Sequence, residues 1–232
     1  MPRDKMTLAQ FKKQFTEIKQ RGYVRSTRRG DTGVGHTFET MLGLKEDNIA
    51  LPDLGDVEVK ARRAGSGSPV TLFTLDRSCW KVKQLPAIKK YGTLDENGRL
   101  GMYFRMSRAP NGSGLYIDIN QQEISVNHVA DGTLAAWSLD RLAQRFMKKF
   151  PALIVVGALS EFRDDGYEYF HYTRAQVLKG TSPEILGAQI AEGNVLVDLR
   201  LHDKGTCARN HGTAFRTDET NLPLLFSHVT DL

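Results

Sequence analysis

Near the start of the chain, apolar residues recur every three or four positions. These residues are Leu8, Phe11, Phe15 and Ile18. The spacing predicts an amphipathic helix from Thr7 to about Arg21, with Thr7 and Gln10 forming a capping box. A second helix is expected from about Gly35 to Leu44.

Apolar runs with the length or alternation of strands occupy much of the remaining chain. The expected strands are Asp53–Lys60, Val70–Leu75, Leu100–Met106, Leu115–Ile119, Glu123–Val129, Leu153–Leu159, Tyr167–Tyr172 and Val195–Leu201. Further helices are expected at Trp80–Tyr91, interrupted by Pro86, at 138–150 and at 182–192. Asp164-Asp165-Gly166 predicts a hairpin turn, and the tail from His202 is expected to be irregular apart from Thr213–Arg216. This order of elements is typical of a mixed α/β fold.

The composition is that of an ordinary globular protein, with 40% hydrophobic and 25% charged residues. A length of 232 residues fits one large domain or two intimate lobes. We expect the approximate lobes to be 1–100 and 101–232. The net charge of +5 favours a polyanionic partner without requiring one.

The cysteines and the lengths of the apolar runs indicate the cellular compartment of the protein. Cys79 and Cys207 have no metal-ligand spacing, and two thiols do not make a disulfide scaffold. No segment approaches about 18 consecutive apolar residues, and the first residues contain no apolar leader. We therefore expect a cytoplasmic protein with no membrane segment.

The most informative polar pattern lies on the expected strand Asp53–Lys60. Valines at 57 and 59 alternate with Glu58 and Lys60, so the valines face one side and the charges the other. Two carboxylates and one ammonium on a polar face can hold a divalent metal beside a phosphodiester. The expected Mg²⁺ ligands are the carboxylates of Asp53 and Glu58 and the carbonyl of Val59. Lys60 would orient the attacking water and stabilise charge in the transition state.

Spacing alone leaves alternatives open at this strand. An acid-x-Lys pattern also occurs on solvated strand faces, where the charges have no catalytic role. Asp56 shares the face of Glu58 by the two-residue period, so it competes with Asp53 for the first ligand position. Glu39, on the preceding helix, is a candidate for a further carboxylate.

Blocks of sequence along nearly the whole chain resemble one nuclease family. The blocks are Gly33-Val34-Gly35-His36-Thr37-Phe38-Glu39, Glu46-Asp47-Asn48-Ile49, Pro52-Asp53, Glu58-Val59-Lys60, Leu72-Phe73-Thr74, Tyr116-Ile117-Asp118-Ile119, Val197-Asp198-Leu199-Arg200 and His211-Gly212-Thr213-Ala214-Phe215-Arg216. Their content and order are similar to those of the MvaI/BcnI restriction endonucleases, which belong to the PD-(D/E)xK nuclease superfamily. The last block is nearer to MvaI than to BcnI.

The resemblance implies a restriction-endonuclease-like α/β fold, with a mixed β-sheet flanked by helices and a catalytic and a recognition lobe around a DNA cleft. It implies a type II deoxyribonuclease that uses Mg²⁺ and acts as a monomer on double-stranded DNA. The expected site is short, pseudo-palindromic and rich in C·G pairs, and cleavage leaves 5′-phosphate ends. Asp53, Glu58 and Lys60 match the catalytic motif, and Glu39 matches its upstream acid. A cognate DNA methyltransferase is expected in the same system.

Two regions are expected to recognise bases. Asp198 and Arg200 lie two residues apart on an expected strand, so both project from one face. Arginine bonds bidentately to guanine and a carboxylate accepts from cytosine N4, so the pair suits a G·C base pair; a surface ion pair is the alternative. In the family the second stretch reaches the major groove, which indicates Arg209, His211 and Arg216. The MvaI pattern has histidine at the place of Arg209, and a loop that contacts only phosphates is the alternative.

A basic stretch precedes the second helix and contains Arg25, Arg28 and Arg29. We expect these arginines to contact the DNA backbone, because such contacts position a protein on the duplex. Thr71, on the strand that follows the catalytic one, is a further backbone candidate. A simple solvated basic patch is the alternative for any one of them.

Two rival functions remain. A mismatch-repair nicking enzyme resembling MutH would share the fold and a similar acid–acid–Lys cluster, but the His211–Arg216 block argues against it. A DNA-binding protein with a degenerate active site is the rival from another class. The presence of Asp53, Glu58 and Lys60 argues against that alternative.

Overall fold

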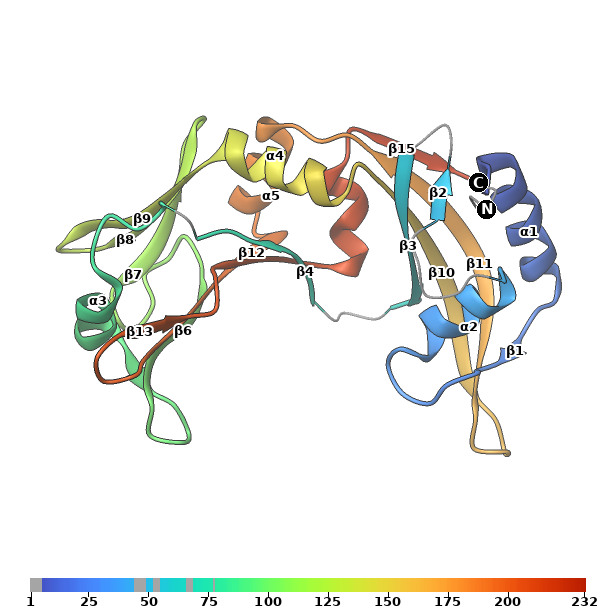
Figure 1. The fold of residues 1–232 in the computed structure, drawn as a ribbon, viewed down its shortest axis with the longest axis horizontal. Helices are drawn as coiled ribbons and strands as arrows, with labels where there is room; N and C mark the ends of the chain where they lie inside the picture. Colours follow the sequence, from blue (N-terminus) through green and yellow to red (C-terminus); the bar gives the residue numbers. More distant parts are fainter. Residues whose placement is uncertain (1–5, 44–48, 52–54, 66–68, 77) are drawn as a thin grey trace. The chain divides into compact units, whose positions relative to one another are not determined.

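The computed structural model describes residues 6–43, 49–51, 55–65, 69–76 and 78–232 (Figure 1). The chain divides into two compact units, each built from separate stretches of sequence. The first comprises residues 1–67, 150–180 and 226–232, and the second comprises 68–149 and 181–225. This division differs from the expected boundary near residue 100, since 68–100 lies in the second unit and 150–180 in the first.

The first unit is built on a mixed sheet in the order β1-β11-β10-β3-β2, with β15 paired to β11. These strands are β1 (Val24–Arg25), β2 (Ile49–Leu51), β3 (Gly55–Arg63), β10 (Ala152–Phe162), β11 (Glu168–Lys179) and β15 (His228–Asp231). Figure 1 shows β10 and β11 as a long antiparallel hairpin, and β3 runs parallel to β10. Parallel pairing places the strand with the acid-x-Lys pattern beside a strand whose first half is apolar and buried.

Two helices cover one face of this sheet, α1 (Leu8–Gln20) and α2 (Gly33–Met41). Phe11 and Phe15 of α1 pack edge-on against Phe38 of α2, with ring centroids 6.2 and 6.5 Å apart. Val57 of β3 is fully buried in the same cluster, and Val59 packs against it. The apolar period of α1 and the alternation of β3 therefore bury their expected faces in one core.

The second unit contains two antiparallel sheets. One has the order β4-β14-β12-β6-β5 with β13 paired to β12, and the other has the order β7-β8-β9. The strands of the first are β4 (Pro69–Thr74), β5 (Thr93–Leu94), β6 (Leu100–Met106), β12 (Val195–Asp203), β13 (Ala208–Asn210) and β14 (Ala214–Asp218). Those of the second are β7 (Leu115–Ile119), β8 (Glu123–His128) and β9 (Gly132–Ser138). The helices are α3 (Gln84–Tyr91), α4 (Leu139–Lys149), α5 (Pro183–Ala191) and the 3₁₀-helix η1 (Glu219–Leu225).

Aromatic side chains join the layers of the second unit. Phe215 of β14 stacks on Phe73 of β4 with centroids 5.0 Å apart, and Trp137 of β9 meets Phe215 edge-on at 6.0 Å. The Trp137 indole N–H donates to the carbonyl of Leu75 at 2.8 Å. Aromatic pairs of this geometry add to the stabilisation from burial. The core therefore lies on one face of the larger sheet and leaves the other face for polar side chains.

Most predicted elements are confirmed, including the Thr7–Gln10 capping box. Three predictions differ from the structure. The helix expected from Trp80 begins at Gln84, so Pro86 falls in the first turn, where its missing N–H is not needed. Strands β1, β2, β5 and β9 were not expected. The tail beyond His202 is ordered into β13, β14, η1 and β15 rather than mostly irregular, because its short polar strands pair with distant partners. None of the described helices is long and apolar enough to span a membrane.

Candidate functional site

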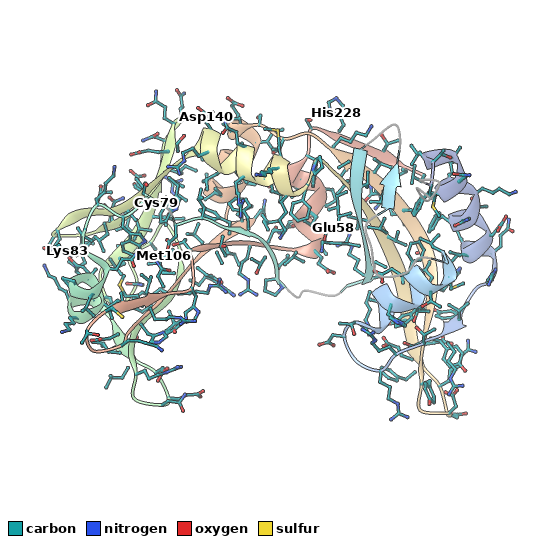
Figure 2. The ribbon with its side chains drawn as sticks, in the orientation of Figure 1. Glu58, Cys79, Lys83, Met106, Asp140 and His228 are labelled. Carbon is teal, nitrogen blue, oxygen red and sulfur yellow. The ribbon has the colours of Figure 1, made fainter. Side chains whose placement is uncertain are left out.

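The charged face of β3 lies opposite the core of the first unit. Glu58 and Lys60 are on this face, and Figure 2 labels Glu58 on the strand. Lys60 Nζ lies 2.7 Å from Glu58 Oε1, and about a third of each side chain is exposed, 31% and 33%. An ion pair this exposed contributes at most about 1 kcal/mol to stability. The pair is therefore placed to exchange its partners for a ligand at little cost to the fold.

The other predicted members of this site are placed less directly. Asp53 lies outside the described residues, and so does the side chain of Asp56. Val59 pairs with Ile154 of β10, which fixes the backbone at position 59 within the sheet. Glu39 is half-buried on α2, and no hydrogen bond or ion pair joins it to Glu58 or Lys60 in the described structure.

Glu39 nevertheless acts electrostatically on the interior of the first unit. Burial raises the pKa of the Tyr172 hydroxyl, and the charge of Glu39 adds to that rise. The hydroxyl donates to the carbonyl of Val34 on α2 at 2.8 Å, so it fixes the helix against β11. This contact holds the helix that carries Glu39 in a defined register on the sheet.

The donor chemistry of the β3 face fits a hard divalent cation. A carboxylate oxygen of Glu58 and the carbonyl of Val59 are the kinds of oxygen that Mg²⁺ binds. Among the residues that the structure describes, no group of three histidine, cysteine, aspartate or glutamate side chains forms a metal cluster. Asp53, the first carboxylate of the predicted motif, falls outside those residues.

The second polar surface lies on the larger sheet of the second unit. We call it the basic sheet face and define it by Tyr103, Arg105, Asp198, Arg200, His202, Arg209 and Arg216. Asp198, Arg200 and His202 alternate with the buried residues Val197, Leu199 and Leu201 of β12. The register places Arg105 opposite Asp198, Tyr103 opposite Arg200 and Arg209 opposite His202. Four arginines against one carboxylate make this face suited to a polyanion.

Asp198 is held by arginines on both neighbouring strands. Arg216 Nη1 donates to Asp198 Oδ2 at 3.1 Å, and Arg105 Nε lies 3.6 Å from Oδ1. The aspartate is only 8% exposed. Its Oδ1 and the Nε of Arg216 are buried without a hydrogen-bond partner in the described structure. Each of these atoms therefore keeps hydrogen-bonding capacity that an incoming polar ligand could use.

Arg200 and His211 meet through the loop between β13 and β14. Arg200 Nη2 donates to the carbonyl of His211 at 3.1 Å, and Nε donates to that of Gly212 at 3.3 Å. The backbone N–H of His211 donates to the carbonyl of Arg200 at 2.9 Å. The structure therefore brings the two predicted base-recognition segments together, with Arg209 exposed on the adjacent strand.

Three members of this face were not predicted from the sequence: Tyr103, Arg105 and His202. The signal for the first two was their two-residue spacing on an expected strand, but only the register with β12 shows which face they share with Arg200. His202 falls where the strand was expected to have ended. The Tyr103 hydroxyl and His202 Nδ1 are 2.7 Å apart, so the pair is a specific contact.

The expected backbone-contact arginines surround the turn of the β10–β11 hairpin. Arg25 lies over the ring of Tyr167 at 3.5 Å and 3.7 Å from the Asp165 carboxylate, and Arg29 lies 5.0 Å from the same ring. A cavity of about 450 Å³ beside them is lined by Arg28, Arg29 and Arg63 but also by Asp31 and Glu168. Acids therefore offset much of the positive charge here.

Thr71, the last of the expected backbone contacts, is half-buried on β4 opposite Arg216 of β14. Its carbonyl accepts from Lys149 Nζ at 3.2 Å. The structure therefore places Thr71 beside the basic sheet face of the second unit, not with the arginines of the first.

Comparison with known proteins connects these observations. The family model described as the MvaI/BcnI restriction endonuclease family matches residues 12–226. The chain is similar to a solved structure of MvaI without DNA (26% identity, 100% and 99% of the two chains covered, TM-score 0.65). It is also similar to MvaI in complex with its cognate DNA (26% identity, 97% of each chain covered, TM-score 0.63). A search of curated proteins gives no match.

The match spans most of both units and includes the β3 pair and the basic sheet face. The predicted restriction-endonuclease-like fold class is confirmed by the likeness to both MvaI structures. Enzymes of this kind hydrolyse DNA within restriction systems, generally with divalent metal ions. The chain belongs to the MvaI/BcnI family and is a type II restriction endonuclease.

Proposed function

We propose that this enzyme hydrolyses DNA phosphodiester bonds with Mg²⁺ at a short, pseudo-palindromic site rich in C·G pairs, leaving 5′-phosphate ends. The observation that carries the chemistry is the exposed pair of Glu58 and Lys60, 2.7 Å apart on one strand. The observation that carries the specificity is the basic sheet face. The first unit would then supply catalysis and the second recognition of bases.

The proposed catalytic residues are Asp53, Glu58, Lys60 and Glu39. When bound, the metal supplies Lewis-acid stabilisation of the developing charge and lowers the pKa of the attacking water. Asp53, Glu58 and the Val59 carbonyl would hold it. Lys60 places an ammonium beside the Glu58 carboxylate, where it can orient the nucleophilic water and stabilise negative charge on the transferring phosphate.

Base recognition is assigned to Asp198, Arg200, Arg209, His211 and Arg216. Arginine can donate two hydrogen bonds to guanine O6 and N7, and the carboxylate of Asp198 can accept from cytosine N4. In this structure Asp198 is largely buried between two arginines. Arg216 must therefore move, or a base must approach closely, before Asp198 reaches a base edge.

We also propose that the enzyme works as a cytoplasmic monomer. A monomer has one active site, so it would nick one strand and then engage the other. The relative whose solved structure includes cognate DNA supports double-stranded DNA as the substrate. A cognate methyltransferase would protect the host sites.

Digestion of a mixed-sequence plasmid with purified protein tests this function. Mg²⁺ is expected to give a discrete set of fragments, with a nicked circle before the linear form. Sequencing of the ends would then identify the site and the 5′-phosphates. Ca²⁺ in place of Mg²⁺ is expected to support binding with little hydrolysis. Fragments without a common end sequence would contradict site-specific cleavage.

The nicking alternative makes a different prediction. A mismatch-repair enzyme resembling MutH would cut one strand of a hemimethylated site and depend on partner proteins. Linearisation of unmethylated plasmid by the purified chain alone would exclude it. No cleavage with Mg²⁺ would instead favour a DNA-binding protein with a degenerate site.

A further inference from the structure

Three aromatic rings form a ladder across the basic sheet face. The ring of Tyr103 stacks on that of His202 with centroids 6.1 Å apart and planes within 20°. The ring of His202 stacks in turn on that of His211, at 5.4 Å and 29°. The rings come from β6, β12 and the loop after β13, so the ladder joins segments far apart in sequence.

Gly101 leaves room for the ring of Tyr103, the first ring of the ladder. Gly101 lies opposite His202 in the β6–β12 register, and the ring of Tyr103 lies against it. A Cβ atom at position 101 would meet Tyr103 Cε2 and the carbonyl oxygen of Leu201, each at 2.8 Å. Any residue but glycine must therefore displace the ring or strain the backbone. The sequence at position 101 is thus matched to the stacked position of Tyr103.

The second ring, that of His202, is oriented by its contact with Tyr103. Its Nδ1 lies 2.7 Å from the Tyr103 hydroxyl, and the residue is only 7% exposed. Burial lowers the pKa of His202, and the nearby charges of Arg99, His211, Lys204 and Arg209 lower it further. The contact with Tyr103 therefore presents an oriented imidazole ring to the ring of His211.

The third ring of the ladder belongs to His211, one of the residues expected to contact DNA bases. His211 is exposed, and its loop carbonyls accept from the guanidinium of Arg200. The stack on His202 contacts the His211 side chain itself, whereas the bonds from Arg200 hold its loop. A preformed stack lowers the entropic cost of ordering such a side chain on binding.

We infer that Tyr103 and His202 are positioning residues that hold the His211 side chain in its base-recognition orientation. Neither needs to touch DNA. This inference rests on the proposed function, because it requires His211 to recognise a base. Its consequence is that sequence discrimination depends on residues of β6 that lie outside the recognition loop.

The test compares Tyr103→Phe, Tyr103→Ala and Gly101→Ala in the full-length protein. For each, kcat/KM is measured on the preferred site and on sites with one base pair changed. Tyr103→Phe removes only the hydroxyl and is expected to reduce discrimination by about 2- to 10-fold. Tyr103→Ala removes the ring as well and is expected to lose about 10-fold or more.

Gly101→Ala separates positioning from direct contact. It leaves every polar group of the ladder in the chain, yet it should reduce discrimination as Tyr103→Ala does. Tyr116→Phe and Tyr116→Ala on β7 are the matched controls, because the Tyr116 hydroxyl makes no hydrogen bond within the described structure. Both controls should keep wild-type discrimination.

A measurement without DNA tests the positioning of His211 separately from the proposed function. NMR of the histidine rings in the free protein should show the pKa of His202 rising toward its ordinary value in Tyr103→Ala and Gly101→Ala, with shifted His211 signals. Unchanged signals would overturn the ladder. Shifted signals with wild-type discrimination would overturn its role in recognition. If the wild-type protein cleaved no DNA, the proposed function would fail and take the recognition role with it, whatever the ring signals showed.

Discussion

The polar faces of the two main sheets differ in how they are assembled. On β3 of the first unit, Glu58 and Lys60 come from one strand, two residues apart, and pair with each other. On the larger sheet of the second unit, the polar face draws side chains from β6, β12, β13 and β14. The first face is local in sequence, whereas the second exists only once distant strands have paired.

A site whose residues lie close together in the sequence can be predicted from one sequence, whereas a site assembled from distant strands cannot. Catalysis at a phosphodiester needs a few charges at fixed spacing, and one strand supplies them through its two-residue period. Base recognition needs a broad surface of donors and acceptors matched to a groove. Such a surface requires several strands in register, so its full membership is a property of the fold.

The largest expected effect is at the local face. Lys60→Ala should reduce the cleavage rate by about 10²–10³-fold or more, because it removes charge stabilisation in the transition state. Binding to the preferred site should remain. Single-turnover cleavage and a binding assay in Ca²⁺ measure the two separately. Lys13→Ala, on the exposed side of α1, is the matched control; wild-type cleavage by Lys60→Ala would remove Lys60 from the mechanism.

A second ion pair of the first unit should matter for folding rather than chemistry. Arg63 donates to both carboxylate oxygens of Glu168, each at 2.6 Å, and to the carbonyls of Gly30 and Asp31. Glu168 is mostly buried, with a side chain 10% exposed. Glu168→Gln should therefore lower the free energy of unfolding by about 2–3 kcal/mol at pH 7.

The pH dependence of that loss follows from the pKa of Glu168. The hydrogen bonds from Arg63 hold this pKa below its ordinary value. The pair thus stabilises the fold above the unfolded-state pKa and is lost as pH falls through the lower folded-state value. Urea unfolding between neutral and acid pH should show wild type and variant converging. Glu161→Gln, which breaks an exposed pair, should cost at most about 1 kcal/mol, and a pH-independent loss at Glu168 would contradict the charge argument.

At the assembled face, Arg200→Ala should cost about 1–3 kcal/mol of discrimination at one G·C pair. Part of this loss is expected to come through the loop, since Arg200 donates to the carbonyls of His211 and Gly212. Competition binding with sites changed at each position measures it. An equal loss on all sequences would mean that Arg200 contacts phosphate.

The smallest effects concern the arginines around the hairpin turn. Arg29→Ala should reduce the slope of log K against log salt by about 0.9 if Arg29 neutralises one phosphate. Arg25→Ala should change the slope less, because Arg25 already pairs with Asp165 and stacks on Tyr167. Equal slopes for both variants and wild type would show that this surface does not contact the backbone.

The sequence predicted much of the first unit and less of the second. The apolar period of α1 and the alternation of β3 were sufficient, because each buries one face of a single element. The lobe boundary expected near residue 100 differs from the boundary between the two units. The reason is that β10 pairs with β3, so the β10–β11 hairpin belongs to the first unit. His202 and Tyr103 were not predicted because neither lies in a recognisable sequence motif. Their contact depends on the register of β6 with β12 and on Gly101 opposite His202.

The most direct test of the division between chemistry and recognition uses Glu58→Gln and a randomised duplex library. DNA retained by the variant in Ca²⁺ would be sequenced and compared with the ends that the wild type produces in Mg²⁺. If the two units divide chemistry and recognition in this way, the variant cleaves at a greatly reduced rate yet selects the wild-type site. A variant that cleaves at the wild-type rate, or that retains DNA without enriching that site, would contradict it.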